Sequence, residues 1–192
     1  PVSNDDVSRD ISAAVKAGEG SVLEASVYMQ GKYAFWRITN PGMWTWDFNN
    51  TTGNWTERRS YGRDDCRGCG SVHAFDRWVS GDRTTGKLFE IDPETYAEAD
   101  DPLAAIARSG PAAAFPSRLA VPRMDLDFTG AVGVASGDDP TQTDPKVRIR
   151  WSRDGGHTFG SWVTRSIGGQ GDSTRRVAVQ PVGVTGPKGI VV

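Results

Sequence analysis

The sequence predicts an all-β protein built from short antiparallel strands, with one short helix at the start of the chain. Apolar and polar residues alternate in short runs, the pattern of strands with one buried face. The 192 residues include 23 glycines and 11 prolines spread between those runs, where they supply turns. Tryptophan occurs seven times, and large aromatic side chains provide much of the buried area in small β-structures.

The helix is expected over residues 3–17, where the apolar side chains take helical spacing. One face carries Val7, Ile11, Ala14 and Val15. Ser3 or Asp5 can cap the first turn, and Gly18 and Gly20 follow the last one. A helix this short is unstable alone, so it is expected to dock on the rest of the protein.

Strands are expected in quick succession from residue 22. Their predicted ranges are 22–29, 34–39, 45–48, 55–60, 72–75, 77–80 and 87–92. Two aromatic-bearing hairpins, 44–55 and 87–96, resemble each other, because each has an aspartate at the strand exit and a threonine in the turn. Near-repeats spaced by about 40–45 residues are typical of propeller blades, each a small antiparallel sheet.

The second half of the chain is less regular. Residues 99–118 are rich in alanine, but the prolines among them argue against a long helix. Residues 119–128 alternate like a strand, with Pro122 marking an edge or a bulge. Residues 130–145 form a polar, acidic loop, and a last strand region is expected at 182–192.

Charge is unevenly distributed, although the net charge is only −2. From Lys146 onward eight basic residues accompany two acidic ones, an excess of +6, whereas residues 1–145 carry 14 basic and 22 acidic side chains, or −8. An uneven charge distribution is evidence about binding partners and not about the fold. It is compatible with a solvated basic face, a nucleic-acid contact or a head-to-tail contact between copies. No apolar run reaches the length of a membrane span, so no membrane partner is expected.

The most informative segment is 146–162. It begins with a half-buried strand that has an arginine face, since Val147, Ile149 and Trp151 alternate with Arg148, Arg150 and Ser152. The following run, Ser152-Arg153-Asp154-Gly155-Gly156-His157-Thr158-Phe159, matches the Asp-box, S-x-D-x-G-x-T-[W/F], of sialidases and other β-propellers.

The Asp-box predicts a hairpin corner. Asp154 is expected to accept hydrogen bonds from turn N–H groups. Gly155 and Gly156 are suited to positive φ. Thr158 is expected to bond across the turn, while Phe159 anchors it in a sheet. The motif is structural and lies away from the active site in enzymes that contain it, so it indicates a propeller rather than a hydrolase.

The wider context resembles the C-terminal region of the packaged-DNA stabilisation, or tail hub (nozzle), proteins of short-tailed phages, the podoviruses. That family typically shows a strand ending in R-W-S, a D-G-G-x-T-[W/F] turn, an S-[I/L]-G step and a basic R-x-R-V strand. The matching residues here are Arg150-Trp151-Ser152, 154–159, Ser166-Ile167-Gly168 and Arg175-Arg176-Val177. Segments 28–36, 44–48, 55–60 and 80–82 follow the same family's order, so the resemblance covers nearly all of residues 3–192.

The resemblance implies a partial β-propeller from the C-terminal half of a longer protein, with a helical lead-in, 1–20, and a hub domain, 21–192. Proteins of that family form a homohexameric ring in the virion tail, below the portal and adaptor proteins, and assemble in the host bacterial cytoplasm. The ring extends the DNA channel, retains packaged double-stranded DNA, and docks tailspikes or fibres and the tail needle. The family is not enzymatic, and the resemblance implies no catalytic residue, cofactor or metal.

The candidate contact residues are Arg148, Arg150, Arg175 and Arg176. The alternatives for these side chains are a neighbouring subunit, packaged DNA or solvent. A subunit interface is favoured, because phosphate contact requires only positive charge and is otherwise unspecific.

Two other functions compete with the tail hub interpretation. A sialidase-like glycosidase needs three converging arginines, a carboxylate acid and a tyrosine nucleophile, and no such set is visible in the spacing; acidic pairs such as Asp64-Asp65 are expected to be exposed. A receptor- or glycan-binding module of a phage tail fibre shares the fold and would stack sugars on Trp44 and Trp46, although packing is the simpler role for both.

The two cysteines, Cys66 and Cys69, form a single C-x-x-C. Such a pair can be redox-active or half of a zinc site, with His73 as a third ligand. Because the chain has no second cysteine pair, incidental turn thiols are the simpler interpretation.

Overall fold

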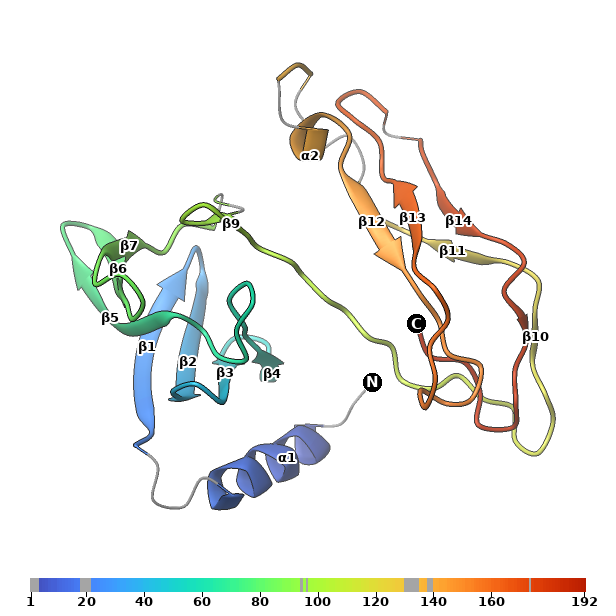
Figure 1. Cartoon of the computed structure of the whole chain (residues 1–192), viewed down its shortest axis with the longest axis horizontal. Helices are drawn as coiled ribbons and strands as arrows, with labels where there is room; N and C mark the ends of the chain where they lie inside the picture. Colours follow the sequence, from blue (N-terminus) through green and yellow to red (C-terminus); the bar gives the residue numbers. More distant parts are fainter. Residues whose placement is uncertain are drawn as a thin grey trace. The chain divides into compact units, whose positions relative to one another are not determined.

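The computed structural model describes residues 4–17, 22–93, 95, 97–129, 135–137, 140–172 and 174–192. Internal contacts divide the chain into two compact units, Val2–Ile106 and Ala107–Val192, here called the N-terminal and C-terminal units. Most elements are antiparallel strands (Figure 1), which confirms the all-β class at that level. The described strands form small separate sheets and no closed propeller.

The two units meet between Ile106 and Ala107 in the chain. The expected division into a lead-in, 1–20, and a hub domain, 21–192, stays a prediction. The physical reason for the boundary between the units is local pairing. Each named strand up to residue 102 pairs within the N-terminal unit, and each one from residue 120 pairs within the C-terminal unit.

The expected helix is present as α1, Asn4–Ala17. Ile11 is buried, and Ala14 and Val15 are half-buried, so the described part of the predicted apolar face is covered. α1 contacts β4 in the N-terminal unit, which supplies the docking that so short a helix needs. The predicted cap Ser3 and the predicted stops Gly18 and Gly20 lie outside the described residues.

A four-stranded antiparallel sheet follows, in the order β1-β2-β3-β4 (Figure 1). Its strands are β1 (Glu24–Gln30), β2 (Tyr33–Asn40), β3 (Trp44–Asn49) and β4 (Asn54–Glu57). Gly31 and Gly42 have φ of 59° and 79° in the first two turns, a conformation that side chains disfavour. Four predicted strands therefore form one meander in chain order.

The two faces of this sheet are unlike those of a typical core sheet. One face carries a row of four side chains in register across the strands, Val27, Trp36, Phe48 and Trp55. Val27 is 56% exposed and Trp36 is 42% exposed. The opposite face holds the buried polar side chains of Tyr28, Arg37, Thr39, Thr45 and Asp47. The covered face of the sheet is therefore polar.

The remaining strands of the N-terminal unit form two small sheets. They are β5 (Gly68–Ala74), β6 (Arg77–Asp82) and β7 (Leu88–Glu90), in that order, and the pair β8 (Ala97–Glu98) and β9 (Asp101–Pro102). In the second predicted aromatic hairpin, 87–96, the strand ends at Glu90, and its described partner is β6. Glu94 and Tyr96 lie outside the described residues, so the near-repeat stays a prediction.

The described residues of the C-terminal unit form three antiparallel strand pairs. They are β10 (Ala120–Val121) with β15 (Gly183–Val184), β11 (Met124–Leu126) with β14 (Val177–Val179), and β12 (Lys146–Ile149) with β13 (Val163–Ser166). The single predicted strand 119–128 is thus broken at Pro122, which has no N–H to donate to a ladder. A one-turn helix, α2 (Pro140–Thr143), precedes β12.

The core of this unit is apolar. It is formed by Ile149, Val177, Val179, Val182 and Ile190. Within the predicted last strand region, 182–192, only Gly183 and Val184 belong to a named strand, while Ile190 and Val191 form single bridges. Among the described residues, no helix is long and apolar enough to cross a membrane.

Candidate interaction site

The Asp-box residues form a hydrogen-bonded turn between β12 and β13. Asp154 Oδ1 accepts the Ser152 hydroxyl at 2.5 Å and the N–H groups of His157 and Thr158, both at 2.9 Å. Asp154 Oδ2 accepts the Thr158 hydroxyl at 2.6 Å. The Ser152 oxygen accepts the Gly156 N–H at 2.8 Å. Asp154 and Thr158 therefore make the contacts that the motif predicts.

This turn is held against the last residues of the chain. Ser152 exchanges backbone hydrogen bonds with Val191, at 2.7 and 3.2 Å. Gly155 and Gly156 adopt φ of 77° and 95°, as expected. A Cβ at Gly155 would lie 2.8 Å from the Cβ of Lys188, so close packing as well as φ requires glycine there. The Asp-box is thus a structural corner of the C-terminal unit.

The hydrogen bonds around Asp154 also determine its charge state. The Ser152 hydroxyl, followed by the hydroxyl and N–H of Thr158, holds the pKa of the Asp154 carboxyl well below its usual range. The carboxylate remains ionised down to strongly acidic pH. The Asp154 carboxylate therefore serves the turn as a hydrogen-bond acceptor and carries no proton near neutral pH.

Phe159 does not lie in a strand, although the motif predicts that it anchors the turn in a sheet. Its half-buried ring instead contacts two guanidinium groups. The Cζ atoms of Arg150 and Arg108 lie 4.8 and 5.2 Å from the ring centroid. The reason is the length of the loop: β13 begins only at Val163, so Phe159 precedes the sheet.

Arginines and aromatic rings alternate along the outer side of the β12–β13 hairpin. Arg150 also lies 4.4 Å from the centroid of Trp162, and Arg148 lies 5.2 Å from the same ring. The resulting order is Arg148, Trp162, Arg150, Phe159, Arg108, which we call the arginine–aromatic ladder. Stacking on a ring restrains a guanidinium while leaving its in-plane N–H donors available.

The ladder is open to solvent. Trp162 is 48% exposed, and Arg108, Arg148 and Arg150 are all exposed. Among the described residues, no carboxylate pairs with Arg148 or Arg150. Stacking on the rings therefore restrains these two arginines while both stay exposed to solvent.

The other two predicted contact arginines lie elsewhere in the same unit. Arg175 pairs with Asp172 at 3.3 Å, and both side chains are about half exposed. Arg176 is exposed, directly before β14. The structure thus brings Arg148 and Arg150 together on the ladder and assigns Arg175 and Arg176 no contact with it.

Two members of the ladder were not predicted from the sequence. Trp162 lies on the face of Arg148 because Arg148 pairs with Thr164, two residues further on, and alternate residues of a strand share a face. The pairing of β12 with β13 could have indicated Trp162. Arg108 carries no such signal, because it comes from an irregular segment 40 or more residues away in the chain.

The charge polarity follows the division into units. The C-terminal unit, 107–192, has eleven basic and seven acidic side chains, a net charge of +4. The N-terminal unit and the residues before it, 1–106, have eleven basic and 17 acidic side chains, a net charge of −6. The ladder therefore belongs to the positively charged unit.

The N-terminal unit is organised around buried ion pairs. Arg37 Nε and Nη2 donate to the two oxygens of Asp47 at 2.7 and 2.8 Å, and the Tyr28 hydroxyl donates to the same carboxylate at 2.7 Å. Burial raises the pKa of the Tyr28 hydroxyl well above its usual range. The charges of Arg37 and Asp47 are therefore paired with each other inside the fold.

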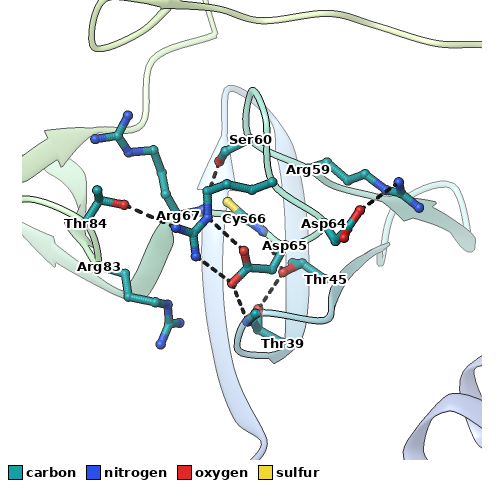
Figure 2. Close-up of polar contacts among 12 residues, drawn as sticks. Thr39, Thr45, Arg59, Ser60, Asp64, Asp65, Cys66, Arg67, Arg83 and Thr84 are labelled. Atoms are coloured by element: carbon teal, nitrogen blue, oxygen red, sulfur yellow. Dashed lines mark hydrogen bonds and ion pairs between the residues drawn. The ribbon is translucent and has the colours of Figure 1, made fainter.

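A second buried ion pair joins the loop before β5 to the last residue of β6. Arg67 makes a two-pronged pair with Asp82 at 2.9 and 2.7 Å. Figure 2 shows the contact of Arg67 with Ser60, in which the backbone N–H of Arg67 donates to the Ser60 hydroxyl. The ion pair, together with the hydroxyl of Thr85, holds the pKa of the Asp82 carboxyl well below its usual range. Arg67 and Asp82 thereby connect segments 15 residues apart.

Asp64 and Asp65 differ, although the sequence predicts that both are exposed. The side chain of Asp64 is 75% exposed and pairs with Arg59 (Figure 2). Asp65 is only 1% exposed, and it accepts the N–H of Gly42 at 2.8 Å and the guanidinium of Arg63. The prediction is wrong for Asp65, because the Gly42 turn is folded over it from another part of the chain.

The two cysteines face different surroundings. Cys66 is buried, its N–H donates to Thr45 (Figure 2), and its sulfur lies 3.4 Å from Nη1 of Arg37. Cys69 is half-buried, and its sulfur lies 3.5 Å from the carbonyl oxygen of Gly81. No cluster of three or more metal-ligating side chains occurs within the described part of the chain.

The tryptophans proposed for sugar stacking are not the most open ones. Trp44 is 9% exposed and Trp46 is half-buried, whereas Trp36 and Trp162 are 42% and 48% exposed. A stacking role for Trp44 would require its removal from the interior.

Comparison with known proteins adds no family to these observations. The chain matches no protein-family model and no curated protein.

Proposed function

We propose that this chain is a structural component of a short-tailed phage virion, in the tail hub or nozzle ring, and not an enzyme. The observation that carries the proposal is the Asp-box corner, whose Asp154 accepts four hydrogen bonds, within a run of residues that resembles the hub family. The role is to extend the DNA channel below the portal and adaptor, retain packaged DNA, and dock tailspikes or fibres and the tail needle.

The architecture of the N-terminal unit supports a propeller-type protein. A four-stranded antiparallel meander is the form of one propeller blade, and β1 to β4 have that order. Blades pack face to face, and this sheet offers an open aromatic face with Trp36 and its neighbours. In a propeller, a neighbouring blade would cover this aromatic face.

The surface chemistry supports an assembly subunit. Trp, Phe and Arg are the residues enriched at protein interfaces, and all three occur on the open ladder. The buried carboxylates of Asp47 and Asp82 are each paired with an arginine inside the fold. In the proposed homohexamer no cofactor, metal or membrane is required, and contact with DNA is non-specific.

The alternative is a receptor- or glycan-binding module of a tail fibre, which would use the aromatic face of the β1–β4 sheet. Trp36 and Trp55 lie 5.7 Å apart with their planes tilted by 55°, and Phe48 and Trp55 are tilted by 48°. Rings tilted in this way pack on one another rather than presenting a flat platform to a sugar. This geometry favours packing against another sheet.

Cryo-electron microscopy of the source particle tests the proposal. Six copies around the axial channel below the portal are expected. Absence from the axial tail, or trimers at its periphery, would refute the hub assignment and favour the fibre module. The same map would show which side chains face the DNA.

A further inference from the structure

From the arginine–aromatic ladder we infer an interaction surface for a second copy of this chain: the ladder of one copy binds the acidic N-terminal unit of the next. The inference rests on the proposed ring and names the surfaces that would join its subunits. It begins from the five ladder residues, Arg108, Arg148, Arg150, Phe159 and Trp162.

The guanidiniums of the ladder are preorganised for binding carboxylates. Arg150 lies within 4.8 Å of both ring centroids, and Arg148 and Arg108 each lie over one ring. Stacked guanidiniums lose less conformational freedom on binding than free ones do. Their planar edges match the two oxygens of a carboxylate, which they can bind in two-pronged fashion. Among the described residues no carboxylate pairs with Arg148 or Arg150, and both exposed guanidiniums could bind a carboxylate of a partner.

The composition of the surface favours protein over nucleic acid. The rings of Phe159 and Trp162 each lie beside two guanidiniums, which would compete with bases for stacking on them. Phosphate contacts need only positive charge, and they do not require arginines supported by rings. An exposed tryptophan among arginines is instead typical of the residues that contribute most to protein–protein affinity.

Charge complementarity identifies the partner as another copy. The N-terminal segment 1–106 has a net charge of −6, against +4 for the unit that carries the ladder. A contact between unlike surfaces of two copies is heterologous, and repetition of such a contact closes a ring when the rotation allows it. Opposite charges on the two units would favour this head-to-tail pairing over pairing of like units.

Self-association of the purified full chain tests the inference, by sedimentation velocity at about 0.05 M and about 0.5 M salt. The ladder variant is Arg148→Glu/Arg150→Glu. The matched control is Arg175→Glu/Arg176→Glu, which changes the net charge equally at exposed arginines outside the ladder. Trp162→Ala, a third variant, removes one ring without changing charge, and circular dichroism verifies that each variant is folded.

The wild-type chain is expected to associate at low salt, with a dissociation constant raised at least about tenfold in the ladder variant and by less than about threefold in the control. The Trp162→Ala variant is also expected to self-associate more weakly than the wild-type chain. Wild-type chains that stay monomeric, or equal losses in the ladder and control variants, would overturn the inference. Binding of a short DNA duplex that the ladder variant weakens, together with self-association that the ladder variant leaves unchanged, would also overturn the inference.

These results are separate from the test of the hub itself. If sedimentation contradicts the ladder contact but six copies surround the tail channel, the ring forms through another surface. If the chain is absent from the axial tail but associates through the ladder, the contact between copies stands and the hub proposal fails.

Discussion

Removing Arg37 tests whether the N-terminal unit depends on its buried ion pair. Arg37→Met keeps an unbranched side chain of similar length but deletes the donors to both oxygens of Asp47. The Asp47 carboxylate is 2% exposed, so little water can replace the lost partner. Only the hydroxyl of Tyr28, at 2.7 Å, would remain among the side-chain donors described for it.

The expected cost is large. Breaking a buried ion pair by removing one partner costs about 3–5 kcal/mol of unfolding free energy, because a buried charge is left uncompensated. Urea slopes for small units are about 2 kcal/mol per molar, so the midpoint should fall by about 1.5–2.5 M. Arg59→Met is the matched control, because Arg59 and Glu57 form a pair whose side chains are 53% and 37% exposed. That pair should contribute about 0–1 kcal/mol.

Urea unfolding followed by tryptophan fluorescence measures both variants. Five of the seven tryptophans lie in the N-terminal unit, so the signal reports mainly on that unit. An Arg37→Met midpoint within experimental error of the Arg59→Met midpoint would refute the reasoning. The double variant Arg37→Met/Asp47→Leu should recover much of the loss, because it removes both buried charges. A double variant no more stable than Arg37→Met would count against uncompensated charge as the cause.

Three further predictions concern the Asp-box and the thiols. Asp154→Asn should speed amide hydrogen exchange in residues 152–160, because the charged acceptor of four hydrogen bonds is lost, whereas the control Asp172→Asn should not. The folded-state pKa of Asp154 lies below the unfolded value, so its stabilisation is present above about pH 4 and is lost as the pH falls further. Acid unfolding should therefore depend less on pH in Asp154→Asn than in the wild-type chain. Identical acid-unfolding curves for the two proteins would contradict this prediction. Cys69 should react with a thiol reagent before the buried Cys66 does, and Cys69→Ser should abolish the fast phase; a fast phase that survives would show that Cys66 is accessible.

The sequence was a good guide where the determining interactions are local. Strand alternation and turn glycines predicted each of β1 to β4, with ends that differ by at most three residues from those observed. The Asp-box was equally predictable, since all the donors to Asp154 lie within four residues of it. Pro122 marked the break between β10 and β11, because a missing N–H is a property of the residue itself.

Contacts between distant segments decided the rest. Alternation in β2 separates Arg37 from Trp36, but it does not say which face the protein covers, and here the polar face is buried. Asp65 is buried by a turn more than 20 residues earlier in the chain. Arg108 joins the ladder only because its segment lies beside Phe159 in the C-terminal unit.

The sequence by itself determined the β class, the order of the first meander and the Asp-box corner, because each depends on residues that are neighbours in the chain. The tertiary structure alone decided which of the candidate arginines have aromatic partners, which carboxylates are buried, and where the chain divides into units. Those properties depend on which elements pack together, and a periodic pattern of polar and apolar residues is compatible with several such packings.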